Sequence, residues 1–176
     1  MRRIAVGIMA LLPCGLLSAS LSLSPTAGIG LVRPASAANV FLNVIDNAVT
    51  LAPSATDYSN DYVEITGASG LRVEVKTNSA TGLVLYVKCA DAAPQIRLSD
   101  FLVRTLTAPA TGGTSMTSYT TIAATDQALW SSGVALGPFT QVNLDIRIRN
   151  LSAYTDAPGG STTGYTNTLT FTVIAQ

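Results

Sequence analysis

The sequence predicts an all-β fold in which two antiparallel sheets pack face to face. Apolar and polar residues alternate with a period of two along most of the chain, and no window of a dozen residues shows the apolar stripe of an amphipathic helix. The alternating runs are short and are separated by turns rich in Gly, Pro, Ser and Asn, as in β-sandwiches. We expect an immunoglobulin-like sandwich, with a jelly roll or a small barrel as the alternative architectures.

Residues 1–37 have the three-part pattern of a secretory signal peptide. Arg2 and Arg3 precede an apolar run, and a small-residue cleavage motif, Ala-Ser-Ala, ends at Ala37. A retained membrane helix is the alternative, because the apolar run is almost long enough to span a bilayer, but a proline and several serines interrupt it. We expect cleavage after Ala37, which leaves one domain of residues 38–176. This mature domain is expected to be secreted or held at the cell surface, after periplasmic transit in a Gram-negative cell.

The charge of the mature domain argues against polyanionic partners. Removal of the leader takes away three of the ten basic residues and none of the ten acidic ones, which leaves seven against ten, a formal charge of −3. Charged residues make up only 11% of the chain, and none of them form a basic block. A mildly acidic domain of this kind lacks the electrostatic footprint of a nucleic-acid or anionic-membrane binder. We expect no nucleic-acid partner and no membrane insertion after cleavage.

Several chemistries have no residues to support them. The absence of histidine removes Ser-His-Asp and Cys-His catalysis and imidazole-based zinc sites, and no glycine-rich phosphate-binding pattern occurs. After loss of Cys14 with the leader, Cys89 stands alone, so the mature chain cannot form an intramolecular disulfide. Its phase with Leu83, Leu85 and Val87 predicts a buried thiol. We therefore predict a protein that is not an enzyme and has no cofactor.

The first segment of the mature chain, residues 39–51, is apolar on both faces of its expected strand. Such a strand needs cover on both sides. It is either the first strand of its own sandwich, the interpretation that we favour, or a donor strand that completes the sheet of a neighbouring subunit by β-augmentation. The candidate assembly residues are Val40, Phe41, Leu42, Val44 and Ile45.

Three carboxylates cluster in the next stretch, DYSNDYVE. Asp57, Asp61 and Glu64, together with Asn60, offer the oxygen ligands that calcium prefers. Their spacing does not match an EF-hand loop, and acidic residues in a Ser- and Asn-rich turn are usually solvated. They are therefore weak candidates for a metal site, and a glycosidase carboxylate pair is a weaker candidate still.

The region from Tyr62 to Cys89 predicts a meander of three antiparallel strands. The alternation places strands at 62–66, 71–76 and 83–89, and glycines in the intervening segments suit the positive φ angles of tight hairpins. Tyr86 in the third strand and Trp130 further on are expected between the two sheets.

The second half of the chain continues the strand pattern. The apolar phase changes between Leu98 and Phe101, which predicts a bulge or bend at Ser99–Asp100. The stretch Gln141–Arg149 is the clearest strand, with one core-facing row and one row, including Asp145, that faces water. Loops are expected over residues 108–118, 131–138 and 156–164.

The last strand alternates threonines with a row that includes Leu169, Phe171 and Val173. The threonine face suits water, and the apolar row suits the core of a strand fixed in its own sandwich. If subunits exchange strands, this strand is therefore expected to form the wall that receives a donor.

Three stretches, residues 63–89, 142–151 and 164–176, together resemble secreted bacterial β-sandwich proteins related to pilins and spore-coat protein U. The closing Gly-Tyr-Thr-x-Thr pattern, continued by alternating apolar residues and threonines, carries much of this resemblance, which covers about two thirds of the mature chain. It implies a pilin-like immunoglobulin fold, an extracellular structural or adhesive role, and subunits joined by strand complementation. The chain departs from many pilins in lacking a second mature cysteine for an intradomain disulfide.

Two functions follow as hypotheses. The first is a secreted, non-catalytic structural subunit of a bacterial surface filament, pilus or coat, which associates with itself or with other surface subunits, with residues 39–45 as the candidate donor strand. The alternative is a monomeric extracellular adhesion or carbohydrate-binding module that uses its loops. Tyr58, Tyr119 and Tyr154 are the candidate binding aromatics, because turn-like residues surround them.

Overall fold

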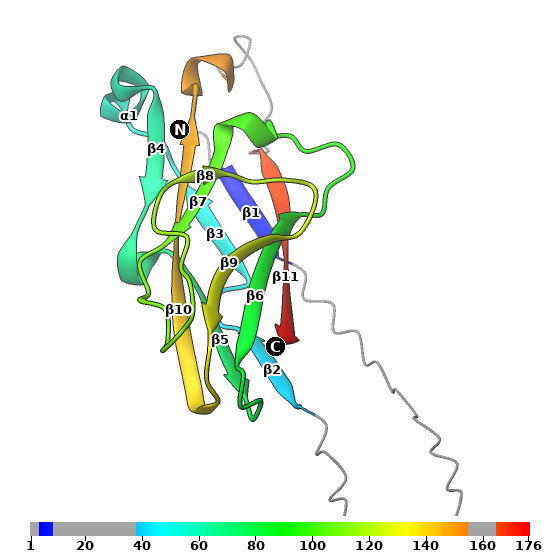
Figure 1. Ribbon diagram of the computed structural model, residues 1–176. Coiled ribbons are helices and arrows are strands. Elements are labelled where there is room, and N and C mark those ends of the chain that lie inside the picture. Colours follow the sequence, from blue (N-terminus) through cyan, green and yellow to red (C-terminus); the bar gives the residue numbers. More distant parts are fainter. Residues whose placement is uncertain (1–3, 9–37, 155–164) are drawn as a thin grey trace, which may run out of the picture.

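The protein consists of two β-sheets stacked face to face (Figure 1). The structure, a computed structural model, describes residues 4–8, 38–154 and 165–176. Sheet A has five strands and sheet B has six. The expected all-β architecture is therefore confirmed for the described residues. The expected cleavage site and the loop expected at 156–164 lie outside them.

Sheet A combines strands from both ends of the chain. Its strands are β1 (Ile4–Ile8), β3 (Ala48–Leu51), β6 (Leu83–Cys89), β9 (Gln127–Ser132) and β11 (Thr166–Ala175). Across the sheet they lie in the order β3-β1-β11-β6-β9. All neighbouring pairs are antiparallel except β1 and β11, which run parallel.

Sheet B is antiparallel and is organised around one long strand. Its strands are β2 (Val40–Val44), β4 (Tyr62–Ile65), β5 (Leu71–Thr77), β7 (Phe101–Thr105), β8 (Thr120–Thr121) and β10 (Leu136–Arg149). The order is β2-β5-β10-β7-β8, with β4 also paired to β10. Short helical elements connect them, and none of the described helices is long and apolar enough to cross a bilayer. They are α1 (Ala55–Asn60) and the 3-10 helices η1 (Gly67–Ser69), η2 (Leu98–Asp100) and η3 (Leu151–Tyr154).

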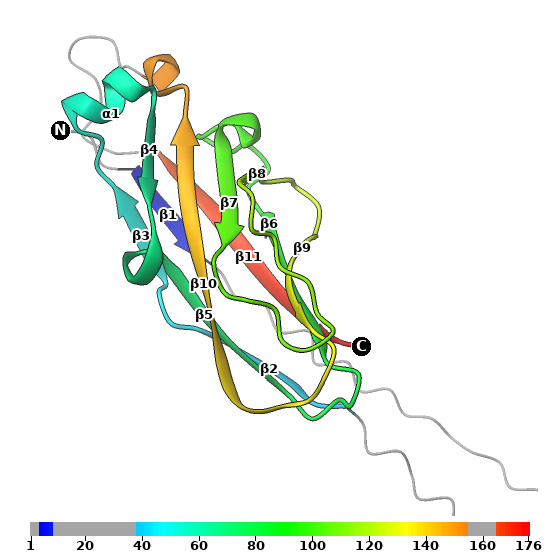
Figure 2. The ribbon, with the colours of Figure 1, turned by 60° about the vertical axis from the view of Figure 1, so that its left-hand side comes forward.

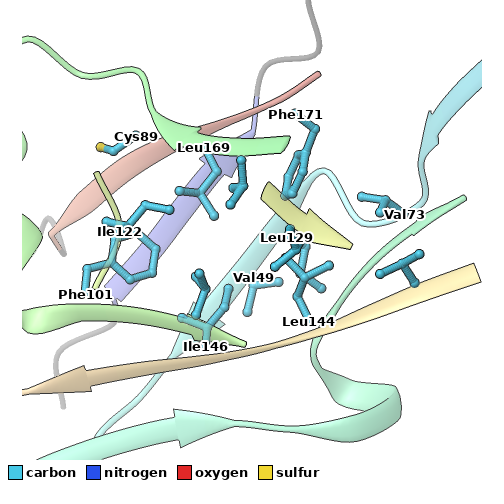
Figure 3. Packing of buried hydrophobic residues seen from close by; sticks show 14 of the residues in the cluster. Val49, Val73, Cys89, Phe101, Ile122, Leu129, Leu144, Ile146, Leu169 and Phe171 are labelled. Carbon is cyan, nitrogen blue, oxygen red and sulfur yellow. The ribbon is translucent and has the colours of Figure 1, made fainter. Parts of the chain in front are cut away.

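The core is a single apolar layer between the sheets (Figure 3). Alternate residues of β6, and of β10 from Val142 to Ile148, are buried, as the period of two predicts, and Phe171 of β11 is fully enclosed. Cys89 is buried at the end of β6, which confirms the predicted placement of its side chain, and this burial raises the pKa of the thiol.

The two expected core aromatics differ in position. Trp130 is buried, and its indole Nε1 donates a hydrogen bond to the Ala108 carbonyl at 3.0 Å. The expectation for Tyr86 is wrong. Its neighbours Leu85 and Val87 fill the core phase of β6, so the tyrosine lies half-buried on the outer face of sheet A.

The expected meander is wrong in its pairing, although its strand positions are nearly correct. β4 and β5 lie end to end along the same edge of β10, with Ile65 opposite Ile146 and Leu71 opposite Leu144. β6 lies in the other sheet. Gly70 allows the junction, because a Cβ on this residue would stand 2.2 Å from the Leu144 carbonyl oxygen. The glycine-rich segment is thus a step along β10 rather than a hairpin turn.

The expected water-facing row of β10 is also partly wrong, because Asp145 is fully buried. Its carboxylate accepts hydrogen bonds from the Gly67 amide and from Arg104 Nε, each at 2.9 Å. The segment between β4 and β5 therefore covers this carboxylate and donates a hydrogen bond to it. Arg104 on β7 neutralises its charge.

Of the two loops expected at 108–118 and 131–138, the first agrees with the structure and the second is shorter than expected. No strand is assigned within 108–118, in agreement with the prediction. However, β9 extends to Ser132 and β10 begins at Leu136, so only three residues separate them. The expected bend at Ser99–Asp100 falls within η2, a 3-10 turn that leads into β7.

Replacement of Phe171 tests the core. We expect Phe171→Ala to lower the free energy of unfolding by about 3–5 kcal/mol, because the enclosed ring leaves a cavity that cannot collapse fully. Ile174→Ala on the same strand is the control. That side chain is 52% exposed, so its loss should cost less than about 0.5 kcal/mol. Urea unfolding measures both, and equal losses would contradict the assignment of the two faces of β11.

Candidate strand-acceptor site

One strand position in sheet A is filled from a distant part of the sequence. β1 lies between β3 and β11 (Figure 2), antiparallel to β3 over four residue pairs and parallel to β11 over four. Among the described residues, β3 has no ladder within sheet A other than the one with β1. We call the position between residues 48–51 of β3 and residues 166–169 of β11 the acceptor slot.

The walls of the acceptor slot are apolar on the core side except at Asn167, which is also buried. Val49, Leu51 and Leu169 are buried. They are paired with positions 6, 4 and 8 of β1, where the sequence has Val, Ile and Ile. The intervening positions of β1 carry Ala and Gly and are paired with residues outside the core. The slot thus accepts a strand that has apolar residues at alternate positions.

The backbone of β11 favours a strand on its slot side. On the opposite side, the Thr166 amide donates to Gln95 Oε1 at 2.8 Å, and the Thr168 amide donates to Asp91 Oδ2. Because successive amides of a strand point in opposite directions, the peptide groups of Asn167 and Leu169 are directed to the slot. A strand in the slot satisfies these groups, and their loss of partners would carry a desolvation cost.

Asn167 holds this part of β11 in position. Its side chain is fully buried, accepts a hydrogen bond from the Ile96 amide at 2.9 Å and donates one to the Ile96 carbonyl at 2.8 Å. Asn167 thus binds both backbone groups of Ile96, as a paired strand would, and links β11 to the connection before η2. The sequence pattern did not predict this role, although Asn167 is a polar amide in phase with Leu169.

The expected assembly strand lies in sheet B. Residues Val40–Val44 form β2, an edge strand antiparallel to β5, with Val40 opposite Thr77 and Val44 opposite Val73. The structure therefore places this segment at an edge of sheet B within its own sandwich. Val40, Leu42, Val44 and Ile45 are half-buried, and Phe41 is 50% exposed.

The three candidate metal-ligating carboxylates are used for other contacts. Asp57 forms a capping box with Ser54 at the start of α1, a helix that the sequence analysis missed. Asp61 caps the end of α1 in the left-handed conformation and accepts the Ser152 amide at 3.3 Å. Glu64 binds Arg147. The described residues contain no group of three acidic, cysteine or histidine side chains suited to a metal.

The outer face of sheet B carries a cluster of stacked arginines and tyrosines. The guanidinium carbon of Arg147 lies 4.5 Å from the Tyr62 ring centroid and 4.1 Å from that of Tyr119. The guanidinium carbon of Arg104 lies 4.3 Å from the Tyr119 centroid. Both arginines are also paired, with Glu64 and with Asp145. The cluster therefore fastens the segment before β8 onto the sheet.

The three tyrosines proposed as binding aromatics have different surroundings. Tyr58 is 42% exposed. The Tyr119 hydroxyl donates to Glu64 at 3.0 Å, and the buried Tyr154 hydroxyl donates to Asp100 at 2.7 Å. Burial, followed by the neighbouring carboxylate, raises the pKa of both Tyr119 and Tyr154 to about 12. Only Tyr58 of the three has the exposure of a ligand-binding ring.

Comparisons with known proteins supply no relative. A scan against protein-family models finds no match, and searches of curated proteins and of solved structures find no significant match. The class that the structure defines is therefore an all-β protein of two packed sheets, with the acceptor slot as its most distinctive site.

The Asn167 side chain is expected to govern the order of the connection before η2. Asn167→Ala should lower the free energy of unfolding by about 1–3 kcal/mol, because both backbone groups of Ile96 lose their partner. It should also speed hydrogen exchange at the Ile96 amide. Thr172→Ala, at a half-buried position of the same strand, is the control. Unchanged exchange at Ile96 would show that the side chain does not hold this segment.

The Tyr154–Asp100 contact predicts a loss of stability at alkaline pH. The pKa of Tyr154 is about 12 in the folded chain, against an ordinary value of 10. The folded state therefore favours the protonated phenol, and this contribution is complete below pH 10 and is lost as the pH rises to 12. Urea unfolding from pH 9 to 12 should show the decline, and Tyr154→Phe should reduce it. A variant with the same pH dependence as the unaltered chain would refute the assignment.

Proposed function

We propose that this chain is a secreted, non-catalytic structural subunit of a bacterial surface filament, pilus or coat. The observation that carries the proposal is the acceptor slot, a central strand position of sheet A that residues 38–154 and 165–176 leave to another segment. A domain of this kind needs an added strand. In a mature chain without the leader, another subunit supplies it.

The chemistry of the slot supports strand complementation. Backbone hydrogen bonds to both walls supply affinity, and the buried apolar row selects the residues at alternate positions of the incoming strand. An open slot would leave two unpaired strand edges, which are templates for association. We propose residues 40–44 of a second copy as the incoming strand, because Val40, Leu42 and Val44 repeat the apolar alternation of β1.

The number of backbone pairs favours such an exchange. At its edge position, β2 has one ladder of five residue pairs with β5. A strand in the acceptor slot has two ladders of four pairs each. Transfer of the segment into the slot of a neighbour therefore replaces five pairs with eight. The additional pairs add backbone hydrogen bonds, and each bond contributes a net stabilisation of about 0.5–1.5 kcal/mol. This gain opposes the cost of uncovering β5.

The topology supports the finer assignment to an immunoglobulin-like, pilin-like sandwich. The first mature segment divides between the two sheets, with β2 in sheet B and β3 in sheet A. β11 lies beside the acceptor slot, where a receiving wall was expected from its single apolar face. The alternative, a monomeric adhesion or carbohydrate-binding module, has less support, because Tyr119 and Tyr154 are engaged in internal contacts.

The proposal is tested by the association state of residues 38–176. We expect this chain to form concentration-dependent oligomers in light scattering and a ladder in SDS gels. Leu169→Lys should abolish the oligomers, because a charge in the core row of the slot excludes an apolar strand. Ile174→Lys, at an exposed position of the same strand, should leave them intact.

Deletion of residues 39–45 separates the donor from the acceptor. The deleted chain should be monomeric but should join oligomers of the intact mature chain at their ends, because it retains the slot. Circular dichroism of each variant shows that its sheets are retained. The proposal fails if the intact mature chain remains monomeric at high concentration.

A further inference from the structure

The polarity and register of β1 define how the leader occupies the acceptor slot. Ile4 is opposite Leu51 and Val6 is opposite Val49 on one side, and Ile8 is level with Leu169 on the other. The segment thus spans the full height of the slot and engages both walls. It occupies the position that the proposed function assigns to the strand of a second copy.

The connection between leader and sandwich makes this contact intramolecular. Thirty-one residues separate Ile8 from Val40. A segment on a tether of this length competes at an effective concentration on the order of 1 mM. At about 10 μM protein, a strand of equal affinity from another molecule is therefore at a disadvantage of roughly a hundredfold.

We infer that the leader segment Ile4–Ile8 caps the acceptor slot in the uncut chain, so that cutting the chain behind it opens the slot to a second copy. This inference rests on the proposed function for the identity of the second occupant. The cap and the incoming strand need the same apolar alternation and the same backbone groups, so they exclude each other. Loss of the tether removes the advantage of the cap, and the leader segment then dissociates at micromolar concentration.

A disulfide trap tests the cap in the full chain. Val6→Cys and Val49→Cys place two thiols at directly opposed positions of an antiparallel pair, where the Cα atoms are close enough for a disulfide. Cys14→Ser and Cys89→Ser remove the other thiols. We expect an intramolecular disulfide, visible as a mobility shift without reductant. The control pair, Val6→Cys with Ile174→Cys, should not form one, because β1 is paired with the opposite end of β11.

The release of the cap is tested in the same disulfide variant after residues 21–27 are replaced by the recognition sequence of a site-specific protease. After cutting, the oxidised chain should remain monomeric because the disulfide retains the cap. On reduction, association should increase roughly a hundredfold relative to the uncut reduced chain at about 10 μM, as the effective concentration of the tether predicts.

The outcomes distinguish the inference from the proposed function. If the uncut chain forms no disulfide while the cut chain associates, the inference is overturned and the proposed function stands. If the disulfide forms but the cut, reduced chain stays monomeric, capping is supported and the proposed function fails. β3 and β11 are antiparallel to each other, so direct pairing between them would then account for the monomer.

Discussion

Backbone hydrogen bonding across the acceptor slot is the constraint on which sheet A depends. β3 and β11 are not neighbours, and in the described structure a third strand holds both of them in one sheet. The apolar residues on the two walls face the same core as the rest of the sandwich. The slot is therefore part of the fold, and whatever fills it contributes to the stability of the domain and not only to an interface.

Buried polar contacts keep the β11 wall of the slot and the turns next to it in place. Asn167 ties β11 to the connection before η2, and Asp100, which is buried, accepts hydrogen bonds from Tyr154 and Asn150 in the next turn. On the far side of the molecule, Asp145 anchors the step between β4 and β5. Each of these groups is costly to bury without a partner and is supplied with one. The β11 wall of the slot is therefore held by contacts that do not involve the strand in the slot, whereas β3 is paired only with that strand.

The period of two predicted strands and faces well but not strand partners. β6 was predicted with the bounds that it has, and the buried row of β10 was correct, because alternation reports directly on which side of a strand is covered. The meander failed because pairing depends on which strand offers an edge, which no local pattern records. The prediction for Asp145 was wrong for a related reason, since cover on an outer face comes from distant segments. The prediction for Tyr86 was wrong because the alternation of β6 itself, with Leu85 and Val87 in the core phase, places the tyrosine on the outer face. The acceptor slot itself was hidden because β1 lies within an apolar run that the signal-peptide pattern already explained.

The location of β2 and the acceptor slot on different sheets has a geometric consequence. If copies join as proposed, each subunit gives from an edge of sheet B and receives within sheet A, so the two contact surfaces on a subunit are not the same. Such heterologous contacts either close into a ring, of which a dimer with reciprocal strand exchange is the smallest, or propagate into an open fibre. A fibre built in this way is polar: one end presents an empty slot and the other a free strand. Growth and capping at its two ends would then require different partners.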